Sequence, residues 1–219
     1  MFKNSRALVT GIFAALLVTP VAIASTPATV KQPVFLICPS TAKNSALSLY
    51  VMVDSRDRSK VRSFGIEELS GLNSFGSSYD NVLAAQADPT TRRTQIGVLE
   101  ARDFGRRQLV VEKDDVLHIT LTPRRDGSLS VMCDVRVGSS KRFVIGGKDS
   151  DKRAVVLRYD ESSESWHAQV EALTDSTGKK VEGAIGRRIT GVLFPVASTG
   201  IYMVAVAFDD GTGVLLLDR

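Results

Sequence analysis

Residues 116–137 (VLHITLTPRRDGSLSVMCDVRV) contain the clearest structural pattern of the chain. At their start, apolar and polar side chains alternate, so that Leu117, Ile119 and Leu121 share one face. A period of two predicts a β-strand with one buried face, and the Pro-Arg-Arg-Asp-Gly sequence that follows predicts a tight turn. The chain then returns through a second run of the same kind. We therefore expect an antiparallel hairpin here.

Short runs of alternating or β-branched apolar residues recur along most of the chain. Helical patterns are few: 79–87 follows two serines that can cap it and precedes Pro89, and 66–72 suggests a second short turn of helix. This balance favours a mainly β protein, an antiparallel sandwich or barrel with one or two short helices. The expected strands are residues 34–38, 47–53, 92–104, 109–111, 116–122, 128–137, 143–145, 153–159, 165–173, 189–194, 201–208 and 213–217.

Residues 143–166 resemble a single repeat of the kelch family, in the pair Gly146 and Gly147 and in the aromatic residues Tyr159 and Trp166. A propeller needs several such repeats, and no second copy occurs in the chain. We therefore expect an ordinary meander of three strands in this region and carry no function over from the resemblance.

The first 24 residues have the pattern of a secretion signal. Lys3 and Arg6 precede a short apolar run, and Ala22-Ile23-Ala24 supplies the small-x-small sequence that a signal peptidase accepts. The run is shorter than the roughly 20 apolar residues needed to cross a bilayer, which argues against a retained anchor. We expect export to a periplasm or to the extracellular space, with no membrane span after cleavage.

The remainder of the chain is expected to form one domain. Residues 25–33 are predicted to be a flexible lead-in and residues 34–219 a single β-rich domain, with a division into two lobes, 34–138 and 141–219, left open. The chain has 28 Lys and Arg against 24 Asp and Glu. So small an excess, further reduced by loss of the leader, does not predict nucleic-acid binding.

The chain contains two cysteines, Cys38 and Cys133. In an oxidising compartment we expect them to form one disulfide. The alternative is a reactive thiol, but neither cysteine belongs to a C-x-x-C motif. Two cysteines and two widely spaced histidines are too few for zinc, so no metal and no cofactor are expected.

A catalytic set is not evident in the sequence. There is no G-x-S-x-G motif, and His118 and His167 both lie on polar strand faces. Ser40 and Lys43 match S-x-x-K, but the K-T-G element that accompanies it in penicillin-recognising enzymes is absent. A secreted hydrolase assembled from distant residues, with His118, Ser40 or a carboxylate pair as candidates, is therefore the alternative function.

Arginine pairs are the remaining unusual feature. Each pair lies at an expected strand end or turn, and guanidinium groups bind carboxylates and phosphates through two parallel hydrogen bonds. Pairs that converge on one rim would bind an anionic partner; the alternative is that they keep turns and sheet edges soluble. The candidate partner-binding residues are Arg92, Arg93, Arg106, Arg107, Arg124, Arg125, Arg187 and Arg188.

We therefore predict an exported, non-catalytic β domain that binds a macromolecular partner. An inhibitor, an immunity-type protein and an accessory protein of an envelope assembly all fit this description. The predicted partner is another protein or an anionic envelope polymer; nucleic acid is not expected as a partner, and no membrane span is expected after signal cleavage.

Overall fold

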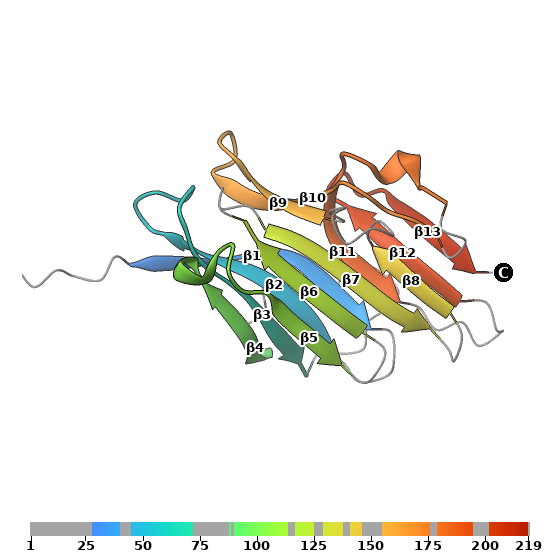
Figure 1. The fold of residues 1–219 in the computed structure, drawn as a ribbon, viewed down its shortest axis with the longest axis horizontal. Helices are drawn as coiled ribbons and strands as arrows, with labels where there is room; N and C mark the ends of the chain where they lie inside the picture. The colour runs from blue at the N-terminus through green and yellow to red at the C-terminus, as the bar shows by residue number, and fades with distance from the viewer. Residues whose placement is uncertain are drawn as a thin grey trace, which may run out of the picture.

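The computed structural model of the chain shows a single sheet that curves into a nearly closed barrel (Figure 1). It describes residues 28–39, 45–71, 88, 90–113, 117–124, 129–137, 141–145, 155–175, 179–194 and 202–218. The strands are β1 (Thr29–Pro39), β2 (Ser45–Asp54), β3 (Val61–Ser70), β4 (Arg92–Glu100), β5 (Leu109–Lys113), β6 (Leu117–Pro123), β7 (Leu129–Val137), β8 (Lys141–Ile145), β9 (Val155–Asp160), β10 (Ser165–Val170), β11 (Arg188–Phe194), β12 (Tyr202–Phe208) and β13 (Gly213–Asp218). The prediction of a mainly β protein is confirmed, in its barrel form.

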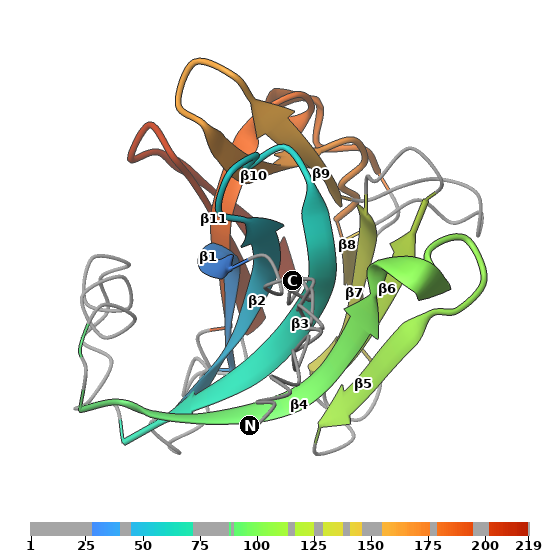
Figure 2. The same ribbon diagram turned by 90° about the vertical axis from the view of Figure 1, so that its left-hand side faces the viewer.

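The main path of the sheet runs in the order β4-β3-β2-β1-β11-β10-β9-β7-β6-β5. Neighbours on this path are antiparallel except β1 and β11, which are parallel. β12 and β13 extend the sheet from β11, and β8 extends it from β7. Figure 2 looks toward one end of the barrel and shows β4 and β5 as the two strands at which the path ends.

Alternation of side chains along the strands fills the barrel with apolar groups. In β2, Leu47, Leu49, Val51 and Val53 all belong to the buried core. Among the described residues, aliphatic side chains of β1, β2, β3, β6 and β7 line the centre of the barrel and leave no space there for a water molecule. Each such side chain stabilises the fold by about 1.5–3 kcal/mol. The interior is therefore a packed core, and functional groups must be sought on the outside.

The hairpin predicted from residues 116–137 is confirmed. β6 and β7 pair in antiparallel register from Leu117 opposite Val135 to Pro123 opposite Leu129. Leu117, Ile119 and Leu121 point into the barrel and are almost fully buried.

The predicted meander of residues 143–173 is wrong in one connection. β8 and β9 do not pair with each other; both use the same edge of β7, β8 along Cys133–Val137 and β9 at Ser130 and Val131. β9 and β10 do form a hairpin, in which the Tyr159 and Trp166 rings lie 5.6 Å apart. The edge of β7 is long enough for two short strands placed end to end, which the sequence pattern does not reveal.

The helical turn expected at 66–72 is also wrong, because residues 66–70 belong to strand β3. The sequence Glu67-Glu68-Leu69 favours a helix by composition. In the structure Ile66 faces the core and Glu67 lies on the outer face of the barrel, where cations of two other strands neutralise it. Tertiary contacts override the local preference here.

The remaining boundaries differ by a few residues. β1 begins at Thr29, inside the expected lead-in, and Pro33 lies at a register shift, where its missing N–H is tolerated. Within the described residues, the helical segments are two 3-10 turns, η1 (Ala101–Asp103) and η2 (Glu182–Ala184). The helix expected at 79–87 lies outside the described residues. Pairing of β1 with β11 joins both halves of the chain in one sheet.

Candidate functional site

One end of the barrel carries a concentration of basic side chains. Here the β2–β3 turn, the η1 turn and the end of β6 come together: Ser63 pairs with Glu100, and the Gly105 N–H donates to the Pro123 carbonyl over 3.2 Å. We call this surface the basic rim. It consists of Arg56, Arg58, Lys60, Arg62, Arg102, Arg106, Arg107 and Arg124.

The turns that carry the rim are held by local hydrogen bonds and by one long-range contact. The Asp54 N–H donates to the Lys60 carbonyl over 3.0 Å and closes the β2–β3 turn. The indole N–H of Trp166 on β10 donates to the Arg58 carbonyl over 2.9 Å, which ties this turn to the opposite wall of the barrel. The arginines of this turn therefore project from a fixed backbone.

The rim holds an excess of positive charge. Segments 54–62 and 100–107 together with Arg124 contain eight basic and four acidic side chains. Their excess of four positive charges equals the formal net charge of the whole chain, which is +4. The whole-chain value counts Lys3 and Arg6 of the expected leader, so the chain carries +2 after cleavage and an excess of acids outside the rim segments. One of these acids, Glu164 of the β9–β10 turn, lies 4.0 Å from Arg58.

Some rim cations are paired and others are free. Lys60 lies 2.8 Å from Asp57, and Arg107 lies 3.9 Å from Asp103. By contrast, Arg102 forms no ion pair with any residue that the structure describes, and the same holds for its rim neighbour Arg106. These two side chains are exposed and available to a partner.

A concavity of about 370 Å³ lies beside Arg102 and is lined by Arg62, Glu100, Ala101 and Arg102. The Arg62 guanidinium pairs with Asp54. The backbone N–H of Arg56, and then the Arg62 side chain, hold the pKa of Asp54 below its usual range. Arg62 and Arg102 give this concavity positively charged walls, and Glu100 adds one carboxylate to its lining.

The first predicted arginine pair lies at the other end of the barrel. Arg92 begins β4, and eight strand steps, or about 26 Å, separate it from Glu100. Arg93 lies 3.0 Å from the carboxylate of Glu67, which is 4% exposed and also pairs with Lys31. We call this group, completed by Tyr50 and Gln95, the Glu67 network.

The Glu67 network joins four neighbouring strands. Lys31 on β1 lies 4.1 Å over the Tyr50 ring on β2, and the Tyr50 hydroxyl donates to Gln95 of β4 over 3.4 Å. The Tyr50 ring covers Gly65 on β3 so closely that a Cβ there would lie 2.3 Å from Cζ. The predicted cation Arg93 is therefore part of the fold.

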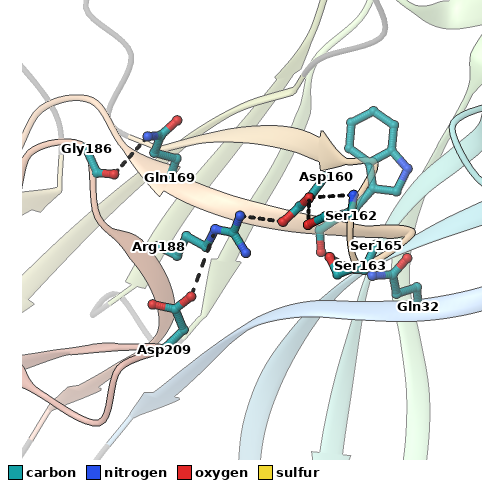
Figure 3. Close-up of polar contacts among 10 residues, drawn as sticks. Gln32, Asp160, Ser162, Ser163, Ser165, Gln169, Gly186, Arg188 and Asp209 are labelled. Atoms are coloured by element: carbon teal, nitrogen blue, oxygen red, sulfur yellow. Dashed lines mark hydrogen bonds and ion pairs between the residues drawn. The ribbon is translucent and has the colours of Figure 1, made fainter.

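The last predicted pair also has partners within the fold. Figure 3 shows Arg188 between Asp160, with which it pairs, and Asp209, whose carboxylate lies 4.0 Å away. The hydroxyl of Ser162, and then Arg188, hold the pKa of Asp160 well below its usual range. Arg187 pairs with Asp210 and lies 3.9 Å over the Phe208 ring.

The structure thus brings Arg106, Arg107 and Arg124 together and leaves the other described pairs apart. Arg125 lies outside the described residues. Sequence reasoning missed the rim contribution of residues 56–62 and of Arg102. The basic run RDRSKVR at 56–62 was the available signal.

The two histidines are far from forming a common site. His118 on β6 lies 3.1 Å from Glu112 across the β5–β6 pair, and both side chains are exposed. His167 on β10 is half-buried, and burial, followed by the nearby Arg188, lowers its pKa. Ser40 lies outside the described residues. Within the described part of the chain, His, Cys, Asp and Glu form no group that could hold a metal ion.

Cys133 is a free, buried thiol, and its burial raises its pKa to about 12. The side chain of Cys38 lies outside the described part. The predicted disulfide is thus not present in this structure and stays a prediction for the exported protein. None of the helices formed by the described residues has the length and apolar character required to span a bilayer.

Comparison with protein families, with curated proteins and with solved structures gave no match. The fold and the charge distribution define the class: a mainly β, barrel-like protein with a packed interior and a basic rim at one end.

Proposed function

We propose that the chain is an exported, non-catalytic binding protein that contacts an anionic macromolecule through its basic rim. The observation that carries the proposal is the location of charge. The rim segments hold an excess of four positive charges, more than the net charge of +2 expected after loss of the leader, and Arg102 and Arg106 have no ion-pair partner among the described residues. Guanidinium groups held on a fixed backbone are suited to bidentate binding of carboxylates or phosphates.

The packed interior supports binding at the outside. Ligand-binding barrels keep a cavity for a small molecule, whereas the centre of this barrel is filled by aliphatic side chains. A surface of turns on a rigid β scaffold is typical of proteins that recognise other macromolecules. An acidic face of another protein and an anionic envelope polymer both supply the required charge.

Two variants of equal charge change test the rim. We would measure binding of the mature protein to immobilised polyglutamate and to inorganic polyphosphate at several salt concentrations. The rim variant is Arg102→Glu with Arg106→Glu, and the matched control is Lys179→Glu with Lys180→Glu, which changes exposed cations elsewhere. We expect about a tenfold loss of affinity in the rim variant, a smaller loss in the control, and a weaker salt dependence after rim reversal.

Equal losses in the two variants would show that net charge alone, and not the rim, governs binding. Turnover of a polysaccharide or ester panel by the purified protein would contradict the non-catalytic assignment. Mass spectrometry of native material gives a separate test of export, because the proposal requires a chain that begins at Ser25.

A further inference from the structure

The concavity of the basic rim has the size of a site for one small chemical unit. At about 370 Å³ it lies near the lower end of the range of small-molecule sites, about 300–1,000 Å³. Its lining comes from the start of β3, the end of β4 and the η1 turn that follows. A surface that recognises a folded protein is broader, about 800 Å² on each partner. The concavity therefore suits a single building block of a larger molecule.

A β-bulge places Arg62 in this lining. Between two successive pairs of the β2–β3 ladder, β3 contains one residue more than β2, and this residue is Arg62. Such a bulge bends the strand and turns a side chain out of the regular alternation. One nitrogen of the Arg62 guanidinium donates to Asp54, whose side chain is 8% exposed. The other N–H groups of Arg62 have no partner among the described residues, so they are held in place and remain available to a ligand.

The rest of the lining adds one carboxylate and a second guanidinium. Glu100 ends β4, and Arg102 lies in the η1 turn just after it; both side chains are exposed. Although they share the lining, neither forms an ion pair with any residue that the structure describes. The concavity thus offers the donors of two guanidinium groups and the acceptors of one carboxylate. A ligand that satisfies all of them carries both an anionic group and hydrogen-bond donors.

Glu100 decides between the classes of anionic partner. An ionised Asp or Glu side chain of a partner protein has only acceptor oxygens, so it would repel Glu100 and leave it without a donor. A sugar acid or a sugar phosphate carries hydroxyl groups close to its anionic group, and hydroxyl groups donate to carboxylates. Ala101 supplies a small apolar surface for the carbon atoms of the ring. An anionic sugar therefore matches the lining better than an acidic side chain does.

We propose that the concavity lined by Arg62, Glu100, Ala101 and Arg102 binds one anionic sugar unit, a hydroxyl-bearing ring with a carboxylate or a phosphate group. Arg62 and Arg102 bind the anionic group, and Glu100 accepts hydrogen bonds from neighbouring hydroxyls. This site depends on the proposed function, because it lies within the basic rim, and it narrows the partner to a polymer that contains such units.

Four small ligands separate the two chemical requirements. Glucuronate and glucose 6-phosphate have both the charge and the hydroxyls, glucose has the hydroxyls alone, and cyclohexanecarboxylate has the charge alone. Each is titrated at low salt into the mature protein, up to about 10 mM, because the binding energy usual per ligand atom gives a sugar acid a dissociation constant of about 1 mM. NMR signals of the backbone amides and of the arginine side chains report binding and locate it.

We expect glucuronate or glucose 6-phosphate, or both, to bind and to shift the signals of residues 62 and 100–102. Glucose and cyclohexanecarboxylate should each bind at least about fivefold more weakly than the better sugar anion, because each lacks one of the two groups. The tighter of the two sugar anions identifies the source of the unit, an acidic polysaccharide or a phosphorylated one.

Two variants test the residues. Arg102→Gln should weaken binding of the better sugar anion about fivefold, whereas its control Lys179→Gln, at an exposed cation elsewhere, should change it little. Arg62 is left intact because it also holds Asp54. Glu100→Gln keeps the shape of the side chain and removes its charge, so it should strengthen binding of cyclohexanecarboxylate and reduce the preference for the sugar anion about threefold. A merely structural role of Glu100 would leave this preference unchanged.

Three results would overturn the proposed site. These are no shift with either sugar anion at the highest concentration, unchanged binding in Arg102→Gln, and equal binding of cyclohexanecarboxylate and the sugar anions, which would favour the carboxylates of an acidic protein. If polyphosphate binding still depends on the rim after such a result, the proposed function stands without the sugar site. If polyanion binding does not depend on Arg102 and Arg106, the proposed function itself fails.

Discussion

The Glu67 network and the basic rim lie at opposite ends of the same strand, yet they use arginine in different ways. At the start of β4, Arg93 donates to a carboxylate that is almost completely buried. Just after the end of β4, Arg102 projects beside a concavity and has no carboxylate partner among the described residues. Only the surroundings, and not the residue type, distinguish these side chains.

The difference is set by neighbouring strands. β3 supplies Glu67 to the outer face, and β1 supplies Lys31 on the other side of the same carboxylate. A buried carboxylate without partners is costly, so the two cations are required there. Around the rim the acids lie in the turns themselves, and Asp54 and Asp57 accept hydrogen bonds within their own turn. Each of them also pairs with one cation, Arg62 or Lys60, and the four acids of the rim segments face eight basic side chains, so cations remain in excess.

The largest expected loss of stability comes from a steric clash within the Glu67 network. In Gly65→Ala the added Cβ would collide with the Tyr50 ring, which is 4% exposed and cannot move without opening the Glu67 network. We expect the free energy of unfolding, measured by urea denaturation, to fall by about 2–3 kcal/mol. Gly183→Ala is the matched control, because nothing lies within 4 Å of its added Cβ. Equal stability of both variants would show that Tyr50 is not fixed against β3.

Removal of the buried charge should have the next largest effect. Glu67→Gln keeps the shape of the side chain but leaves Lys31 and Arg93 without their carboxylate. Both cations are about one-third exposed and regain some hydration, so we expect a loss of about 2 kcal/mol, below the full cost of breaking a buried pair. The control Glu164→Gln changes a side chain that is 70% exposed and should shift stability by less than about 0.5 kcal/mol. A more stable Glu67→Gln protein would mean that desolvation outweighs the ion pairs.

The sequence predicts the strands better than it predicts the charged surfaces. Periodicity identifies β6 and β7 because one face of each is apolar throughout, a property of local sequence. It fails at β3, because the outer face of that strand carries Glu67, whose partners lie 36 and 26 residues away in the chain. The sequence pattern fails to predict the basic rim for the same reason. Arg93 and Arg106 each belong to an arginine pair, and only the assembled sheet shows which of them meets a buried carboxylate.

Truncation of single arginines should change the free energy of unfolding differently in the two regions, and by a smaller amount than the substitutions above. Arg93→Ala removes one of the two cations on Glu67, and we expect about 1 kcal/mol of destabilisation in urea. Arg102→Ala removes a side chain without an ion pair among the described residues, so its stability should remain within about 0.5 kcal/mol of the unmodified protein. A strongly destabilised Arg102→Ala variant would place this residue in the fold and weaken its assignment to binding.

The smallest effect concerns Asp54, the rim carboxylate whose pKa is held below its usual range by the Arg56 N–H and then by Arg62. Because its pKa in the folded state is below the unfolded value of about 3.9, the group stabilises the fold above that pH. This contribution is lost as the pH falls through the folded pKa. In Arg62→Gln, carboxyl-carbon NMR should show the pKa of Asp54 raised but still below 3.9, since the Arg56 N–H remains. The stability of this variant should also fall less steeply in acid. A titration of Asp54 near 3.9 in the unmodified protein would instead show that the turn does not hold this carboxylate. Its negative charge would then offset the positive charge of the rim only above that pH.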